Sequence, residues 1–200
     1  MAFEDAQRLP VRQVELWQRR RFLSEDECAA LIVQVDAKRR PSTLVDNNGD
    51  PEFRTSETGD LDSTDPLALA VTARIAAFLD LPVAHCEPLQ GQRYAKGQQF
   101  KAHTDTFDPG GAGYAEHCAV AGQRTWTAMI YLNEPQAGGA TRFKKLDRMF
   151  YPETGKLLAW NNLLPTGAPN PLTMHQGMPV RAGCKYIITA WFREKPWGWA

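Results

Sequence analysis

The residues of this chain best suited to chemistry are two histidines, an aspartate and a lysine. His103 and Asp105 are separated by one residue, so on an extended strand both side chains project from the same face and can reach one ion. His175 lies in a separate apolar stretch, where a strand could bring its imidazole across the sheet to that ion. Together these three side chains predict a metal site of two nitrogens and one carboxylate.

Such a ligand set leaves one face of the ion open, as in non-heme Fe(II) oxygenases. Two neutral imidazoles and one carboxylate leave a divalent ion with a net positive charge, which suits a chelating 2-oxo acid and O2. Lys185 opens the stretch 185–192, which is typical of a buried strand, and a buried ammonium is costly unless it meets an anion. The distal carboxylate of 2-oxoglutarate would be a suitable anion for Lys185.

Several motifs also follow one another in the order found in a known family. They are the stretch 92–98 around Tyr94, His103-Thr104-Asp105, the stretch 124–133 that begins at Arg124, Gly138-Gly139-Ala140-Thr141, and the stretch from His175 through Lys185 to Trp191. In these motifs the chain resembles the Fe(II)- and 2-oxoglutarate-dependent dioxygenases, and among them the prolyl 4-hydroxylase-like branch. The resemblance extends from about Phe22 to Pro196.

The resemblance implies a role for ten residues. The catalytic iron ligands would be His103, Asp105 and His175, the cosubstrate contacts Lys185, Tyr94 and Thr141, and the substrate contacts Arg54, Ser56, Arg124 and Trp191. It implies Fe(II), 2-oxoglutarate and O2 as cofactors, with ascorbate as a further one. The reaction would hydroxylate an unactivated C–H bond, most simply of a prolyl residue in a peptide or protein, and release succinate and CO2.

Two positions depart from the family pattern, and both concern the substrate. Phe100 stands where these sequences often have a tyrosine, three positions before the first ligand. Arg193 stands where a polar residue often follows the tryptophan by two positions. The first change removes a hydroxyl group, and the second adds a cation if the side chain faces the cleft.

Other functions remain open at this point. Relatives act on free amino acids or small metabolites, so a small-molecule substrate is an alternative to a prolyl peptide. A metal-binding β-barrel without oxygenase activity is another, although such a site would not need the cation of Lys185 or the nearby Tyr94. A cupin-like isomerase or hydrolase usually has a fourth ligand, and a catalytic Cys-His pair lacks any supporting motif.

The first 80 residues predict two scaffold helices. Ser24 and Glu27 form a capping-box pattern that opens a helix through about Lys38. Asp65 and Pro66 mark the start of an amphipathic helix that ends at about Leu79. We expect both helices to brace one face of a sheet.

Short apolar and β-branched runs follow, separated by Gly, Pro and Asn. We expect strands at 87–95, 100–106, 125–132, 140–143, 156–160, 179–181 and 185–193. Seven strands indicate a mainly β fold with flanking helices, and the resemblance implies a double-stranded β-helix, or jelly roll. The chain would be one domain, residues 1–200, with helical support at about 22–80 and a catalytic β core at about 86–196.

Two polar, glycine-rich stretches, 44–61 and 107–123, lie on either side of the His-x-Asp motif. Long loops in a compact domain are often lids, so we predict that both close over the substrate.

The composition of the chain indicates which partners and which cellular compartment to expect. The formal net charge is zero, which gives no electrostatic reason to expect nucleic acid or a membrane surface as partner. The N-terminus has no long apolar segment of a secretory signal, and no stretch approaches a membrane span. The four cysteines show no C-x-x-C pair, as expected for free thiols in a reducing compartment. A cytoplasmic location is the simplest expectation.

Overall fold

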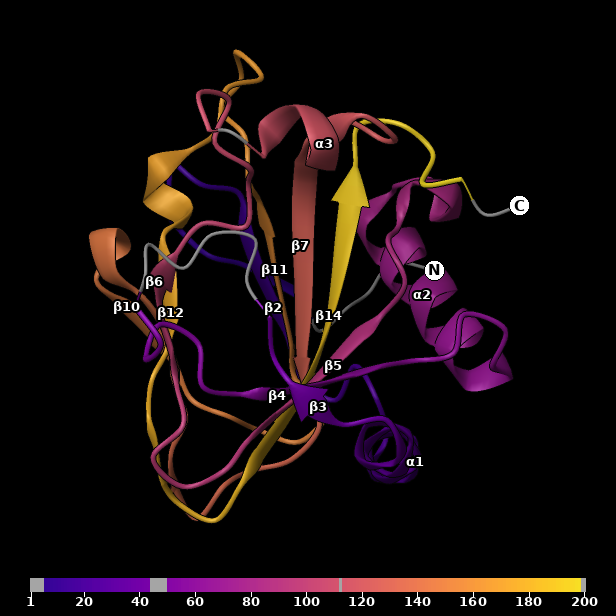
Figure 1. Cartoon of the computed structure of the whole chain (residues 1–200), viewed down its shortest axis with the longest axis vertical. Helices are drawn as coiled ribbons and strands as arrows, with labels where there is room; N and C mark the ends of the chain where they lie inside the picture. Colours follow the sequence, from indigo (N-terminus) through magenta and orange to yellow (C-terminus); the bar gives the residue numbers. More distant parts are fainter. Residues whose placement is uncertain (1–5, 44–49, 112, 199–200) are drawn as a thin grey trace.

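Two antiparallel sheets lie face to face and dominate the computed structural model, which describes residues 6–43, 50–111 and 113–198. The larger sheet has the strand order β1-β2-β11-β7-β14-β5-β4-β3. Its strands are β1 Ala6–Arg8, β2 Leu16–Arg19, β3 Arg40–Pro41, β4 Glu57–Asp60, β5 Gln90–Tyr94, β7 Arg124–Tyr131, β11 Leu157–Asn161 and β14 Lys185–Arg193. Figure 1 shows the long strands β7 and β14 side by side at its centre.

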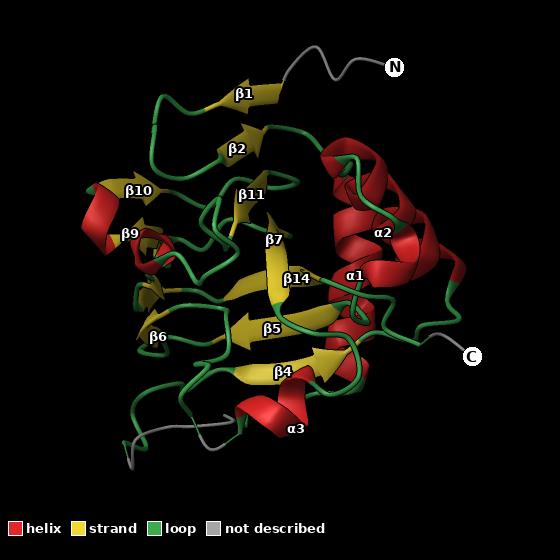
Figure 2. Cartoon of the chain, turned by 90° about the horizontal axis from the view of Figure 1, so that it is seen from above, coloured by secondary structure: helices red, strands yellow, loops and turns green. Residues whose placement is uncertain are grey.

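The smaller sheet has the order β10-β9-β12-β6 and lies on the opposite side of the molecule from the long helices (Figure 2). Its strands are β6 Phe100–His103, β9 Thr141–Phe143, β10 Arg148–Phe150 and β12 His175–Gly177, and a separate pair is formed by β8 Ala137–Gly138 and β13 Val180–Ala182. The helices are α1 Glu25–Ala37, α2 Pro66–Leu79 and α3 Tyr114–Cys118, with 3-10 turns η1 Val83–His85, η2 Lys144–Leu146 and η3 Pro171–Thr173.

The two long helices begin where the sequence predicts. Ser24 accepts a hydrogen bond from the main-chain N–H of Glu27, and the Glu27 carboxylate accepts one from Ser24, which completes the capping box of α1. The Asp65 carboxylate caps α2 by accepting from the main-chain N–H groups of Leu67 and Ala68. Both helices pack on the face of the larger sheet that points away from the smaller sheet (Figure 2).

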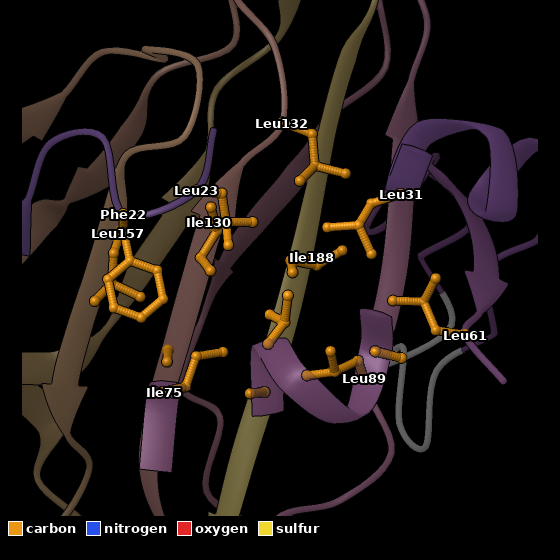
Figure 3. Packing of buried hydrophobic residues seen from close by; sticks show 14 of the residues in the cluster. Phe22, Leu23, Leu31, Leu61, Ile75, Leu89, Ile130, Leu132, Leu157 and Ile188 are labelled. Carbon is orange, nitrogen blue, oxygen red and sulfur yellow. The ribbon is translucent and has the colours of Figure 1, made fainter. Parts of the chain in front are cut away.

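Two hydrophobic cores result, one on each face of the larger sheet. Ile130 and Ile188 point towards α1 and α2, and Figure 3 shows them among the side chains of that core. Their neighbours Tyr131 and Ile187 point the other way, into the core between the sheets. The central strands β7 and β14 are therefore buried on both faces, which explains their nearly continuous apolar sequence.

Helix α1 crosses strands β4 and β5 at a point where both strands carry glycine. A Cβ atom on Gly59 would lie 2.3 Å from the main-chain oxygen of Val35, and one on Gly91 would lie 2.1 Å from a Val35 methyl group. Gly59 and Gly91 are also direct partners in the β4–β5 ladder. The absence of side chains at this pair lets the helix backbone rest directly on the sheet.

The predicted mainly β fold with flanking helices is correct, and strand 185–193 has the expected bounds. The strand predicted at 100–106 ends earlier, at His103, and Asp105 lies in the bend that follows. The predicted loop 44–61 is wrong at residues 57–60, which pair with β5 as strand β4, whereas 44–49 lie outside the described residues. The predicted loop 107–123 contains the short helix α3.

Candidate metal centre and its surroundings

The candidate metal centre is built on a cross-strand pair of histidines. Strands β6 and β12 are antiparallel neighbours, and His103 and His175 are direct partners in their ladder. Asp105 lies just beyond the end of β6, with 3.7 Å between its Oδ1 and Nε2 of His103 and 3.9 Å between its Oδ2 and Nε2 of His175. The donor atoms of all three residues lie within 4.8 Å of one another.

These separations suit one small divalent ion. Adjacent ligands of an octahedral ion at about 2.1 Å lie about 3 Å apart, so closure around a metal needs movements of less than about 1 Å. The set offers two nitrogens and one carboxylate oxygen, and the donor type fits Fe(II) with three positions left for other ligands. The residues present therefore fit the metal that the sequence predicts.

Both imidazoles are oriented by the main chain. Nδ1 of His103 lies 2.7 Å from the oxygen of Lys101, and Nδ1 of His175 lies 3.0 Å from the oxygen of Thr173. Since a carbonyl can only accept, each Nδ1 carries the proton and each Nε2 presents its lone pair to the centre. Burial, together with the nearby His175, lowers the pKa of His103 to about 3, which keeps this ring neutral and able to bind metal.

The third ligand is held by side chains rather than by a strand. The Thr127 hydroxyl donates to Oδ2 of Asp105 at 2.7 Å and in turn accepts from Nδ2 of Asn162 at 2.9 Å. Burial alone would raise the pKa of Asp105, but the two imidazoles and the Thr127 hydroxyl lower it below the usual value. Asp105 is thus held as a carboxylate in the bend after β6.

Lys185 faces the same cavity from the larger sheet. Its side chain is 1% exposed, and its Nζ donates to the oxygen of Gly139 at 3.1 Å and lies 4.2 Å from the centre of the Tyr94 ring. No carboxylate among the described residues forms an ion pair with it. Burial lowers the pKa of Lys185 to about 7. A buried amine without a counter-ion is what a site for the distal carboxylate of 2-oxoglutarate requires.

One cavity of about 40 Å³ brings together most of the predicted site residues. Its lining contains the seven predicted residues His103, Asp105, His175, Lys185, Tyr94, Thr141 and Trp191. Nε1 of Trp191 and Nε1 of Trp160, which also lines the cavity, are buried and have no hydrogen-bond partner among the described residues. Two donors without acceptors in this cavity fit a ligand rich in oxygen atoms.

Arg54, Ser56 and Arg124 do not line this cavity, although two of them contact its walls. The guanidinium carbon of Arg54 lies 4.9 Å from the centre of the Phe100 ring, and that of Arg124 lies 3.8 Å from the centre of the Trp191 ring. Ser56 is buried at the start of β4, where its hydroxyl accepts from Nε of Arg54 at 3.2 Å.

Arg124 is held by a glutamate that the sequence analysis missed. Glu87 accepts from Nε and Nη2 of Arg124 at 2.7 and 2.8 Å, and from Nη1 of Arg193 at 2.8 Å. Burial would raise the pKa of Glu87, but the two guanidinium groups lower it. Glu87 shows no local motif, because both of its partners lie far away in the sequence. Thr127 was missed for the same reason, because its partners Asp105 and Asn162 are 22 and 35 residues away.

The segment 107–123 is closed at its base by one side chain. The amide of Gln123 accepts from the main-chain N–H of Phe107 at 2.9 Å and donates to the oxygen of Phe107 at 2.8 Å. The Arg193 guanidinium adds hydrogen bonds to the main-chain oxygens of His117 and Gly122. This segment is therefore anchored to the end of β14, and whether it closes over a substrate stays a prediction.

Within the described ranges, no helix is both long enough and apolar enough to cross a bilayer.

Comparison with known proteins gives a consistent result. Residues 89–193 match the family model of the 2OG-Fe(II) oxygenase superfamily. A putative prolyl 4-hydroxylase of Acanthamoeba polyphaga mimivirus is 31% identical over 175 residues, which cover 87% of this chain and 72% of the relative. Prolyl 4-hydroxylase subunit alpha-2 of Gallus gallus is 31% identical over 144 residues, and the match covers 72% of this chain but only 26% of that subunit.

A solved structure extends the similarity to the fold. The viral collagen prolyl hydroxylase of Paramecium bursaria Chlorella virus-1, in complex with 2OG, superposes with a TM-score of 0.71 at 26% identity. The match covers 89% of this chain and 95% of the viral one. The predicted jelly roll is thereby confirmed.

Proposed function

The chain belongs to the 2OG-Fe(II) oxygenase superfamily, and from this premise we propose that it hydroxylates a prolyl residue in a peptide or protein. The observation that carries the proposal is the convergence of His103, Asp105, His175 and Lys185 on one cavity. Fe(II), 2-oxoglutarate and O2 are the cofactors of this class of enzyme.

When bound, iron and 2-oxoglutarate supply the oxidising chemistry, in which O2 is consumed, a C–H bond becomes C–OH, and succinate and CO2 are released. The protein supplies positions and charges for this reaction. His103 and His175 would offer Nε2 lone pairs and Asp105 would offer its carboxylate on one side of the metal. Lys185 would pair with the distal carboxylate of 2-oxoglutarate.

Tyr94 and Thr141 would form the walls of the cosubstrate pocket. The Tyr94 hydroxyl donates to Oε1 of Gln92 at 2.7 Å, and the Thr141 hydroxyl accepts from the Tyr131 hydroxyl at 2.7 Å. Both residues are buried, so their positions are fixed before a ligand arrives. The core between the sheets lies directly behind them and would exclude water from the reacting atoms.

The prolyl substrate in this proposal derives from the relatives. Both relatives described above bear the name prolyl 4-hydroxylase, and the mimivirus relative is matched over 72% of its length. A free amino acid or small metabolite is the alternative substrate. The metal barrel without oxygenase activity is disfavoured by the buried amine of Lys185, which has no role in such a site.

The test is hydroxylation of a panel of proline-containing peptides by the protein supplied with Fe(II), 2-oxoglutarate and O2. We expect succinate to form and one peptide to gain 16 Da at a proline, as located by tandem mass spectrometry. Modification of free amino acids with no change in any peptide would favour the alternative substrate class.

Two variants make the result specific to the metal centre. Asp105→Ala removes the one anionic ligand and should lower both iron affinity and turnover by more than about 100-fold, since even loss of an outer partner of a ligand costs about 10- to 100-fold. Asp26→Ala removes an exposed carboxylate on α1 and should leave both unchanged.

The proposal also includes ascorbate as a cofactor and a cytoplasmic location. We include ascorbate as a cofactor that keeps the iron reduced, and a turnover assay with and without it checks this directly. A cytoplasmic location agrees with the free thiols of Cys28, Cys118 and Cys184.

A further inference from the structure

The substrate side of the cavity carries more positive than negative charge. Glu87 is shared by Arg124 and Arg193, so this buried group of three has one cation in excess. Arg54 is a further cation, and among the described residues it forms no ion pair. Its hydrogen bonds go to neutral oxygens of Thr43, Ser56, Thr58 and Gln90, two of them at 3.4 Å.

The cofactor side, by contrast, balances its own charges. Fe(II) brings two positive charges and 2-oxoglutarate two negative ones, while Asp105 and Lys185 contribute one of each sign. The sum is zero when both cofactors are bound. Within the part of the chain that the structure describes, neither the cofactors nor an ion pair offsets the excess on Arg54 and in the Glu87 group.

Arg54 and Arg124 pack on aromatic residues that line the cavity. Arg54 covers the ring of Phe100, and Phe100 stacks on the ligand His103 with 3.5 Å between ring centres. Arg124 covers the ring of Trp191. Each guanidinium thus packs on an aromatic residue of the cavity lining.

The two guanidinium groups are close enough to affect each other and the metal centre. Burial lowers the pKa of Arg54, attraction by Asp105 opposes this change, and repulsion by Arg124 adds to it. Arg124 in turn helps to lower the pKa of Asp105. The cations therefore act on one shared region, and Trp191 adds a buried N–H without an acceptor to that region.

We propose that the substrate carries a carboxylate that pairs with Arg54 beside Phe100, so that the enzyme selects an anionic substrate over a neutral one. This inference rests on the proposed function and narrows its substrate class. Two sources supply such a group: the free α-carboxylate of a chain-terminal proline, and the side chain of an acidic residue next to an internal proline. A guanidinium recognises either one by charge-assisted hydrogen bonds.

The experiment compares matched peptides for binding to the protein loaded with Fe(II) and 2-oxoglutarate without O2. One pair ends in proline as the free acid or the amide, and a second pair has internal proline followed by Asp or Asn. Calorimetry should show at least about 10-fold tighter binding of the anionic member of one pair, and the pair that responds identifies the source. Equal binding within both pairs would overturn the proposal.

Two variants test whether Arg54 causes the preference for anionic peptides. Arg54→Gln should reduce the ratio between acid and neutral peptide to about one while leaving the neutral peptide's affinity within a few-fold, and Arg54→Lys should keep part of the ratio because it keeps the charge. Arg39→Gln is the matched control, since Arg39 is paired with Asp36 and Glu57 on the neighbouring surface. An unchanged ratio in folded Arg54→Gln and Arg54→Lys would contradict the assignment.

A third pair separates this inference from the proposed function. N-acetyl amino acids and their amides are offered in the same assay. If prolyl peptides bind without any charge preference and are hydroxylated once O2 is admitted, only the inference fails. If no prolyl peptide binds but N-acetyl amino acids bind better than their amides, the prolyl substrate fails and the carboxylate pairing stands.

Discussion

The cofactor side and the substrate side of the cavity are built by different means. On the cofactor side, His103 and His175 are partners in a β ladder, and Lys185 is a ladder partner of Tyr94. On the substrate side, Arg124 is held by an ion pair with Glu87, 37 residues away. Backbone register aligns the side chains of the first set directly. On the substrate side Arg124 and Arg193 are ladder partners as well, but their guanidinium groups are oriented by the shared carboxylate of Glu87.

The positions set by strand register and the side chains oriented by ion pairs differ in how far they can vary independently of the fold. A change in register would displace every side chain of a strand, so His103, His175 and Lys185 cannot shift without loss of the sheet. Ion pairs can be exchanged one at a time. We therefore expect the substrate side to be where relatives of this fold diverge in what they accept.

The loss of the Glu87 carboxylate should change the stability of the protein more than any other substitution considered below. Glu87→Gln removes the carboxylate between two buried guanidinium groups, and we expect the free energy of unfolding to fall by about 3 kcal/mol. Denaturant unfolding measures the change. Glu57→Gln, which breaks a half-exposed pair with Arg39 and Arg93, should cost less than about 1 kcal/mol. Equal losses in the two variants would show that burial of the Glu87 group matters little.

On the cofactor side, Lys185→Ala should weaken 2-oxoglutarate binding by about 100-fold, because it leaves a buried carboxylate without its cation. Anaerobic titration of the Fe(II) protein, followed by its visible charge-transfer band, gives the dissociation constant. Lys101→Ala removes an amine of β6 that pairs with Asp50, and it should leave this constant unchanged. A similar constant for wild type and Lys185→Ala would place the cosubstrate elsewhere.

The pH dependence of the same titration tests the charge of Lys185. Its pKa of about 7 before binding means that the amine is protonated below pH 7 and neutral above it. Binding to a neutral amine must take up a proton, so 2-oxoglutarate affinity should fall by about tenfold per unit as the pH rises above 7. Lys185→Arg stays charged and should lose this slope. A 2-oxoglutarate affinity of the wild type that does not change between pH 7 and higher pH would contradict the proposed pairing of Lys185 with the cosubstrate.

The smallest effect concerns the support of the third ligand. Thr127→Val removes the hydroxyl that donates to Asp105, and we expect iron affinity to fall by about 10-fold. Metal titration in the absence of O2 gives the value. Thr125→Val is the control, because that hydroxyl donates to the main-chain oxygen of Phe192 and not to a ligand. Comparable losses in both variants would point to the strand rather than to the hydroxyl.

Much of the cofactor side could be predicted because its signals are local. The spacing of His103 and Asp105 and the capping residues of both long helices are visible within a few positions. The bend at Asp105 could not be predicted, since the end of β6 is set by pairing with the short strand β12. Strand β4 was missed because its sequence lacks apolar alternation and its stability comes from β5 and from Val35 of α1.

The substrate side illustrates the limit of local signals. Arg54, Ser56 and Arg124 could be named only through the resemblance, and nothing near Glu87 indicates that it joins two arginines. Such pairs depend on the folded path of the chain between them. The charge balance on which the choice of substrate depends therefore becomes visible only in three dimensions.

The two hydrogen bonds between the Gln123 amide and the main chain of Phe107 determine where the length of this segment can be changed. Because one amide joins Phe107 to Gln123, a change in chain length between Phe107 and His117 would not pull on β6 or β7. Loop closure grows in cost only slowly with length. We therefore expect that this part of the segment can be exchanged between relatives as a single piece. The candidate iron ligands His103, Asp105 and His175 would keep their positions.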